Sequence, residues 1–323
     1  MNGTLEHTEF RGTPNACSST DAPPFYWLIS LSLGVAAIAG NGLVILANVM
    51  KKVKRNPTNC IITNLASVDF LSGVSLILFH TLPTLSKPAG RGVGAQLFCR
   101  LYCSDYPLWA LLNSSIFNLL LVTVDRYLCV IRPFCHKDVF GRRSVLTTCI
   151  IMTWLLGMIS CSYIILSWVV SSDRDDMCVV DFSLPPWFFL WGGFWSLFGM
   201  LLLPTLLMLI AYAHISYTLS RMPPHSKGRR LQKRVTVSCF AVLSVFFICW
   251  LPDQMFFFLF SLNLPSLPQL SLGSWTYHLV LNLGYANSCL NPLLYAFFNP
   301  NYRRVFKSML GRGTVAVSTG RVN

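Results

Sequence analysis

Long apolar runs separated by short polar segments dominate this chain. A helix needs about 20 predominantly apolar residues to cross the hydrocarbon core of a bilayer. Seven runs of this kind can be read from the sequence. They cover residues 25–50, 59–84, 98–129, 144–170, 186–219, 235–262 and 274–298. The pattern therefore predicts an all-α membrane protein, built as a seven-transmembrane helix bundle.

The segments outside these runs are short. Residues 1–24 form a predicted N-terminal segment, residues 25–298 the transmembrane domain, and residues 299–323 an amphipathic helix and tail. On a helix, the last segment would have one apolar face and one basic face. The apolar face carries Tyr302, Phe306 and Met309, and the basic face Arg303, Arg304 and Lys307. Such a helix suits the membrane interface, so we expect a short eighth helix there.

The composition agrees with a membrane protein. Of 323 residues, 54% are hydrophobic and only 11% are charged, and the mean hydropathy is +0.55. Soluble domains have about 25% charged residues. The net charge of +13 would suit a nucleic-acid partner, but the basic residues form no single patch interleaved with aromatics. We therefore expect no nucleic-acid partner.

The distribution of charge predicts the topology. Most of the 25 Lys and Arg residues follow the first, third and fifth runs or lie in the tail, whereas most acidic residues lie on the other side. By the positive-inside rule the C-terminus is cytoplasmic and the N-terminus extracellular, as in a multi-pass plasma membrane protein. Asn2 opens an Asn-Gly-Thr sequon, so we expect glycosylation there.

The 12 cysteines fall into two groups. Most lie within the apolar runs, where a free cysteine acts as a small hydrophobic residue. Cys17, Cys99, Cys103 and Cys178 lie on the predicted extracellular side, where disulfides persist. These four are the candidates for disulfide bonds.

Short motifs recur in order along the runs. They are "GN" at Gly40, "NLASVD" ending at Asp69, Trp154, "DRY" at Asp125 to Tyr127, Pro204, Tyr212, "CWLP" at Cys249 to Pro252 and "NPLLY" at Asn291 to Tyr295. With these motifs, the chain resembles the class A, rhodopsin-like G protein-coupled receptors from about Gly40 to Leu310. The resemblance implies a ligand on the outside and a heterotrimeric G protein on the inside. It also implies receptor kinases and arrestin at the tail.

The resemblance implies an activation mechanism. Arg126, restrained by Asp125 in the inactive state, is freed as the sixth span swings outward, and Tyr212 and Tyr295 turn inward to support the open state. The residues assigned to activation and coupling are Asp125, Arg126, Tyr127, Tyr212, Trp250, Pro252, Asn291, Pro292 and Tyr295. Each proline removes a helix hydrogen bond and so predicts a kink. The acidic residue that the family has at the start of the sixth span is missing.

Asp69 is a carboxylate within a predicted span, which by default indicates a functional site. The resemblance implies that it binds an allosteric sodium ion together with Ser115, Asn287, Ser288 and Asn291. The alternative is a structural polar cluster. We expect no other cofactor or metal.

Within the family, the third span is similar to that of biogenic amine receptors, especially muscarinic acetylcholine and histamine receptors. The matching residues are Asp105, Tyr106, Asn113, Ser115, Asn118 and Leu119. An amine pairs with a carboxylate and with aromatic faces through Coulomb and cation–π attraction. The predicted ligand-binding residues are Asp105, Tyr106, Trp109, Trp250, Asp253, Gln254 and Tyr285. The alternative for the aromatic residues is ordinary packing.

Two acidic residues depart from the amine-receptor pattern. Asp105 lies three residues too far from Arg126, which would place it about 4.5 Å higher on a regular helix. A bulge near Pro107 would absorb this difference. Asp253 stands where amine receptors have an aromatic residue, and it is either a second counter-ion or a carboxylate satisfied by Gln254 or a neighbouring span.

Two further questions stay open. The sixth span and an acidic loop before residue 182 are also similar to peptide receptors of the relaxin-3 type, so a neuropeptide is the alternative ligand. Cys178 matches the loop cysteine that the family bridges to the third span, and its partner is Cys99, which we favour, or Cys103.

Other classes of membrane protein fit less well. No internal repeat of spans supports a secondary transporter. The sequence has no Gly-rich phosphate loop, no nucleophile elbow and no metal-spaced histidine cluster, so we expect no enzyme. A retinal Schiff base needs a lysine in the seventh span, and none is present there.

Overall fold

The computed structural model describes most of the chain. The described residues are 24–50, 56–80, 92–170, 178–181, 183–223, 227–262, 274–298 and 300–309. Asn2, Cys17, most of the predicted N-terminal segment and the tail beyond residue 309 lie outside them. So does the side chain of Tyr295.

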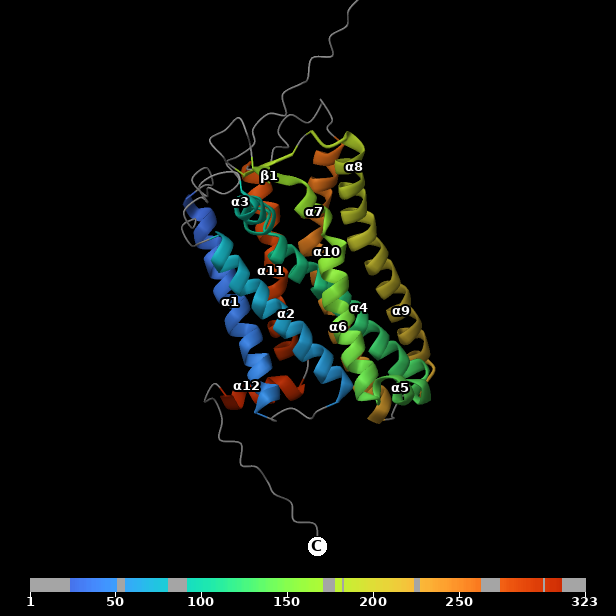
Figure 1. The fold of residues 1–323 in the computed structure, drawn as a ribbon. Coiled ribbons are helices and arrows are strands. Elements are labelled where there is room, and N and C mark those ends of the chain that lie inside the picture. Colours follow the sequence, from blue (N-terminus) through green and yellow to red (C-terminus); the bar gives the residue numbers. More distant parts are fainter. Residues whose placement is uncertain are drawn as a thin grey trace, which may run out of the picture.

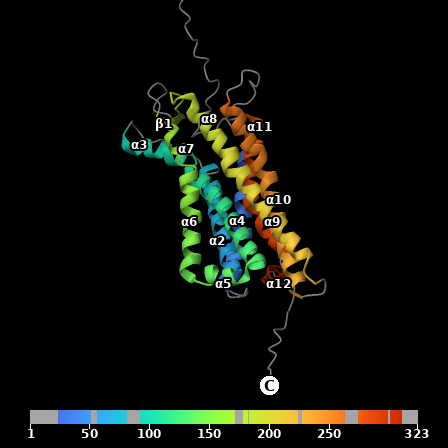
Figure 2. The same cartoon turned by 90° about the vertical axis from the view of Figure 1, so that its right-hand side faces the viewer.

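Long helices form an elongated bundle, seen from two sides in Figures 1 and 2. They are α1 (Pro24–Val49), α2 (Pro57–His80), α4 (Tyr106–Ile131), α6 (Arg143–Ser160), α8 (Pro186–Phe194), η3 (Trp195–Leu202), α9 (Leu203–Ser220), α10 (Lys227–Ser261) and α11 (Trp275–Phe298). Among the described residues, six helical stretches are long and apolar enough to cross a membrane, with α8, η3 and α9 counted as one. The chain is therefore an all-α membrane protein.

The surface of the bundle is apolar and its interior holds polar residues. Ile248 and Ile210 are 63% and 58% exposed, whereas Asp69 and Asn118 are fully buried. This inverted distribution is stable where lipid, not water, surrounds the helices, because exposed apolar side chains cost nothing there. α11 packs along α10 and α1 in the same bundle. Its asparagines make it less apolar than the six stretches selected by hydropathy.

Short elements close the two ends of the bundle. At one end lie α3 (Val93–Phe98), η2 (Cys99–Cys103), α7 (Tyr163–Leu166) and the antiparallel strands β1 (Trp168–Val170) and β2 (Cys178–Val180), with Trp168 opposite Val180. At the other end lie α5 (Pro133–Phe140) and α12 (Pro300–Met309) (Figure 1). We call these the hairpin end and the α12 end.

α12 has the two faces that its sequence predicts. Tyr302 and Phe306 are buried against the bundle, whereas Arg303, Arg304 and Lys307 are exposed. The hydroxyl of Tyr302 receives a hydrogen bond from Nδ2 of Asn48 on α1, 3.1 Å away. Burial raises the pKa of Tyr302 to about 12.

Three predicted runs are not continuous α-helices. In the run predicted at 144–170, α6 ends at Ser160 and the remainder forms the short helix α7 and the strand β1. The run predicted at 98–129 contains a π-helical turn, η2, and regular helix begins only at Tyr106. The run at 186–219 contains a longer π-helical segment, η3, which ends just before Pro204. A proline has no N–H to complete the α-helical ladder, so the helix before it accommodates wider hydrogen bonding. Hydropathy alone does not reveal such changes.

α4 and α6 approach closely at a glycine. A Cβ built on Gly157 would lie 2.0 Å from Oγ of Ser114 and 2.7 Å from the carbonyl oxygen of Ala110. Any side chain at this position would therefore push the two helices apart. This contact fixes α4, which carries most of the candidate site residues.

Candidate functional site

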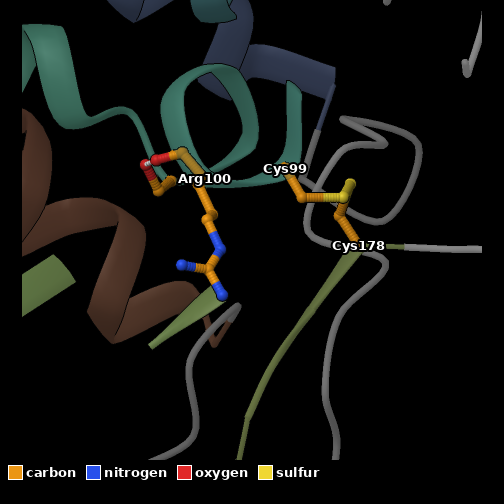
Figure 3. The surroundings of a disulfide bond; sticks show 4 residues. Cys99, Arg100 and Cys178 are labelled. Atoms are coloured by element: carbon orange, nitrogen blue, oxygen red, sulfur yellow. Dashed lines mark hydrogen bonds between the residues drawn. A yellow bond between two sulfur atoms is a disulfide. The ribbon is translucent and has the colours of Figure 1, made fainter. Parts of the chain in front are cut away.

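A disulfide anchors the hairpin end of the bundle. Cys99 in η2 is bonded to Cys178 in β2, with their Cα atoms 5.2 Å apart (Figure 3). This confirms Cys99 as the partner that the sequence favours. Cys103 is disulfide-bonded as well, to a residue other than Cys178.

The π-helical turn places Asp105 above the first turn of α4. Asp105 has φ of 54°, the one positive φ among the described non-glycine residues, and it is the N-cap of α4. Aspartate tolerates this left-handed conformation better than most residues do. From Tyr106 to Ile131 α4 is a regular α-helix, and η2 lies before Asp105, so no bulge absorbs the extra residues between Asp105 and Arg126. The bulge expected near Pro107 is therefore absent, and Asp105 keeps the higher position that a regular helix gives it.

Asp105 lies beside a histidine that the sequence analysis did not identify. Its Oδ2 is 3.2 Å from Nε2 of His80, at the end of α2. The distance is that of an ion pair, but the angle does not make a hydrogen bond. Nδ1 of His80 lies 3.1 Å from the hydroxyl of Tyr26 on α1. Burial and then the charge of Asp105 raise the pKa of Tyr102 in η2.

Aromatic side chains connect Asp105 with α10. The ring of Trp109, one turn below Asp105, lies 6.2 Å from the ring of Trp250 on α10. Asp253 lies one turn further along α10 than Trp250. Both carboxylates therefore stand one turn nearer the hairpin end than a tryptophan of the same helix.

Two tyrosines of α11 complete this group. The ring of Tyr277 lies 5.6 Å from that of Phe256 on α10, about one turn beyond Asp253. Tyr285 is only 3% exposed, and its hydroxyl has no hydrogen-bond partner among the described residues. Its ring lies 5.6 Å from that of His80. We call the group of Asp105, Trp109, Trp250, Asp253, Tyr277 and Tyr285 the acidic–aromatic cluster.

Asp253 is buried, at 4% exposure, and its described partners are neutral. Its Oδ2 accepts a hydrogen bond from Nε2 of Gln254 at 3.0 Å. Oε1 of Gln254 in turn accepts a hydrogen bond from the hydroxyl of Ser196 in η3. The sequence analysis left open whether Gln254 satisfies the Asp253 carboxylate. The structure contains this hydrogen bond, and no cation lies on Asp253 among the described residues.

Tyr106 does not join the cluster through its hydroxyl. That group donates a hydrogen bond of 2.9 Å to the carbonyl oxygen of Met158 on α6. Of the seven predicted ligand-binding residues, the structure therefore brings together Asp105, Trp109, Trp250, Asp253, Gln254 and Tyr285.

Two of the four residues predicted around Asp69 hydrogen-bond to its carboxylate. The Asp69 carboxylate accepts hydrogen bonds from Ser115 on α4 at 3.2 Å and from Asn291 on α11 at 2.7 Å. Three buried side-chain oxygens of α11 have no hydrogen-bond partner among the described residues. They are Oδ1 of Asn287, Oγ of Ser288 and Oδ1 of Asn291. A carboxylate with several unpaired oxygens is a donor set that suits a hard cation.

Asp125 and Arg126 are ion-paired at the α12 end. Nε of Arg126 donates to Oδ2 of Asp125 at 2.9 Å, and the hydroxyl of Thr58 on α2 donates to the same oxygen at 2.7 Å. Oδ1 of Asp125 is 2.8 Å from Nε2 of His136 on α5. Asp125 is fully buried. The sequence analysis missed His136, because a single histidine between two predicted spans carries no periodic signal.

The other predicted activation residues lie on neighbouring helices. The hydroxyl of Tyr127 lies 3.1 Å from Nδ1 of His214 on α9, and that of Tyr212 lies 3.0 Å from the hydroxyl of Thr123. Pro252 and Pro292 lie inside α10 and α11.

Comparisons with known proteins identify the family. Residues 40–295 match the model of the 7 transmembrane receptor (rhodopsin family). The chain is also similar to trace amine-associated receptor 8b of Rattus norvegicus. The two are 26% identical over 306 residues, which cover 85% of this chain and 83% of the relative.

Because the family model covers most of the chain, this protein belongs to the rhodopsin family of seven-transmembrane receptors. It is a multi-pass plasma membrane G protein-coupled receptor of the class that includes biogenic amine receptors, and it is not an enzyme.

Proposed function

We propose that this receptor binds an extracellular amine and that the bound amine activates a heterotrimeric G protein through outward movement of α10. The observation that carries the proposal is the position of Asp105. Its side chain is 25% exposed and lies one turn above the ring of Trp109, which meets Trp250 of α10. An ammonium there would gain Coulomb attraction and contact with aromatic faces. The name of the rat relative also supports an amine ligand.

The proposal includes a topology. The hairpin end faces the outside, α11 is the seventh span, and α12 lies on the cytoplasmic membrane surface as the eighth helix. The exposed basic face of α12 supports this orientation. Receptor kinases and arrestin would then meet the tail on the cytoplasmic side.

We also propose that Asp69 holds an allosteric sodium ion. The unpaired oxygens of Asn287, Ser288 and Asn291 support this assignment, because each would otherwise remain buried without a partner. Ser115 and Asn291 would keep the carboxylate oriented, and the ion would stabilise the arrangement of α2, α4 and α11 in which these groups converge.

Ligand-stimulated nucleotide exchange tests the proposal. Purified full-length receptor in lipid nanodiscs is combined with heterotrimeric G proteins and a panel of amines. We expect at least one amine to accelerate exchange, with a potency that falls tenfold or more in Asp105→Asn. Asp181→Asn is the matched control, because Asp181 lies next to β2 and its Oδ1 accepts hydrogen bonds from Ser183. If only basic peptides accelerate exchange, the ligand is a peptide and the amine proposal is wrong.

A further inference from the structure

The acidic–aromatic cluster contains two carboxyl groups, Asp105 and Asp253, whereas one ammonium group carries a single positive charge. Asp105 stands one turn above Trp109 on α4, and Asp253 one turn above Trp250 on α10. The rings of these two tryptophans are 6.2 Å apart, so the two carboxyl groups lie on different helices above one pair of aromatic rings. Two carboxylates in one site of low polarity repel each other unless cations lie between them.

The two carboxylates differ in what already neutralises them. Asp105 has His80 at ion-pair distance. Asp253 has no ion pair with any residue that the structure describes, and its described hydrogen bond comes from the amide of Gln254. A carboxylate that is 96% buried without a cation is costly to keep in the folded protein. A cationic ligand would supply the positive charge that Asp253 lacks among the described residues.

A third unsatisfied group lies near His80, the partner of Asp105. The hydroxyl of Tyr285 is buried without a hydrogen-bond partner among the described residues. A buried phenol normally has a partner. An ammonium group has three N–H donors, so it can serve a carboxylate and a tyrosine oxygen together.

We propose that the ligand of this receptor is a short aliphatic diamine, whose two ammonium groups pair with Asp105 and Asp253. This inference rests on the proposed function and narrows it to a class of amine. The methylene chain would lie against Trp109 and Trp250, whose rings meet between the two helices. α4 and α10 are in contact, and packed helices have axes about 8–10 Å apart, so a short chain spans the gap.

Matched pairs of ligands test the proposal without any mutation. Each α,ω-diamine with three to eight carbons is compared with the monoamine of the same chain length in the nucleotide-exchange assay described above. We expect the best diamine to be at least tenfold more potent than its monoamine. We also expect one chain length to be best, because the two carboxylates are fixed by their helices. Equal potency of diamines and monoamines would overturn the proposal.

Single substitutions assign the two ammonium groups. In Asp253→Asn, which keeps an oxygen for the amide of Gln254, the diamine should fall to the potency of the monoamine. The potency of the monoamine should stay within about threefold. In Asp105→Asn both ligands should weaken, whereas Asp181→Asn should change neither. Thermal unfolding of each purified variant verifies that it folds.

The outcomes separate this inference from the broader proposal. If monoamines activate the receptor as well as diamines do, the amine function stands and the diamine inference fails. The same holds if Asp253→Asn weakens both ligands equally. If no amine activates it but a peptide with two basic residues does, both fail.

Discussion

His136 offers the sharpest test of how the Asp125–Arg126 pair is restrained. Asp125 is a fully buried carboxylate that receives hydrogen bonds from Thr58, Arg126 and His136. The histidine bond is 2.8 Å long and ties α5 to the end of α4. We consider the substitution His136→Phe, which keeps an aromatic ring beside Phe140 but removes the ring nitrogen.

The size of the effect follows from the charge of the acceptor. A hydrogen bond to a charged group contributes about 1.5–3 kcal/mol, and 1.4 kcal/mol corresponds to about a tenfold change in an equilibrium constant. If the bond is present only in the resting arrangement, its loss shifts the equilibrium toward the active state by roughly 10- to 100-fold at most. Thr58 and Arg126 remain on the carboxylate, so we expect about a three- to tenfold increase in basal activity.

Basal nucleotide exchange on a purified G protein, measured without ligand at equal receptor concentration, is the assay. Lys137→Ala is the matched control, because Lys137 is the next residue on α5 and its side chain is exposed. His136→Gln retains a donor and should restore much of the wild-type value. If His136→Phe leaves basal exchange at the level of Lys137→Ala, then His136 does not restrain Asp125 and this reasoning is refuted.

Three further predictions concern the bundle itself. Asp69→Asn should abolish any dependence of thermal unfolding on sodium concentration, because the substitution removes the charge that would hold the ion. Gly157→Ala should lower the unfolding temperature by several degrees, because its Cβ would lie 2.0 Å from Oγ of Ser114 and overpacking costs about 1–3 kcal/mol. Cys178→Ser should reduce stability by about 2–4 kcal/mol, since it opens the disulfide to Cys99. Thermal unfolding in detergent measures the last two.

Each of these has its own control. Potassium in place of sodium tests ion specificity, and equal stabilisation of wild type and Asp69→Asn by sodium would contradict the sodium assignment. Gly94→Ala should be silent, because no atom lies within 4 Å of a Cβ at Gly94. Cys149→Ser changes a free cysteine and should have little effect. A Gly157→Ala protein as stable as Gly94→Ala would show that α4 and α6 can separate at little cost.

Hydropathy predicted the part of the fold that consists of long helices. The apolar runs located all the long helices, because a span needs about 20 apolar residues whatever its partners are. Helix ends were less predictable. η2 and η3 lie within the predicted apolar runs, so only backbone geometry distinguishes them from α-helix.

The sequence predicted those parts of the candidate site whose residues belong to recognised motifs. Asp69 with Ser115 and Asn291, and Asp125 with Arg126, lie together as expected. His80 and His136 were not found, because each meets its aspartate across tertiary contacts between different elements. The hydroxyl of Tyr106 points toward the carbonyl oxygen of Met158 because α6 lies beside it. Residue spacing along α4 does not reveal this neighbour.

The acidic–aromatic cluster and the Asp69 group are mechanically connected through α11. The ring of Trp250 on α10 packs against the backbone of α11, since a Cβ on Gly284 would lie 3.4 Å from that ring. About two turns further along α11, Asn291 donates to Asp69, whose other donor is Ser115 on α4. A ligand that shifts Trp250 therefore presses on the helix that supplies half of the hydrogen bonds described for the Asp69 carboxylate. Because the two donors come from different helices, movement of α11 relative to α4 must lengthen at least one of these bonds. Because the bundle is closely packed and these hydrogen bonds are either made or broken, we expect it to switch between two discrete arrangements and not to deform gradually.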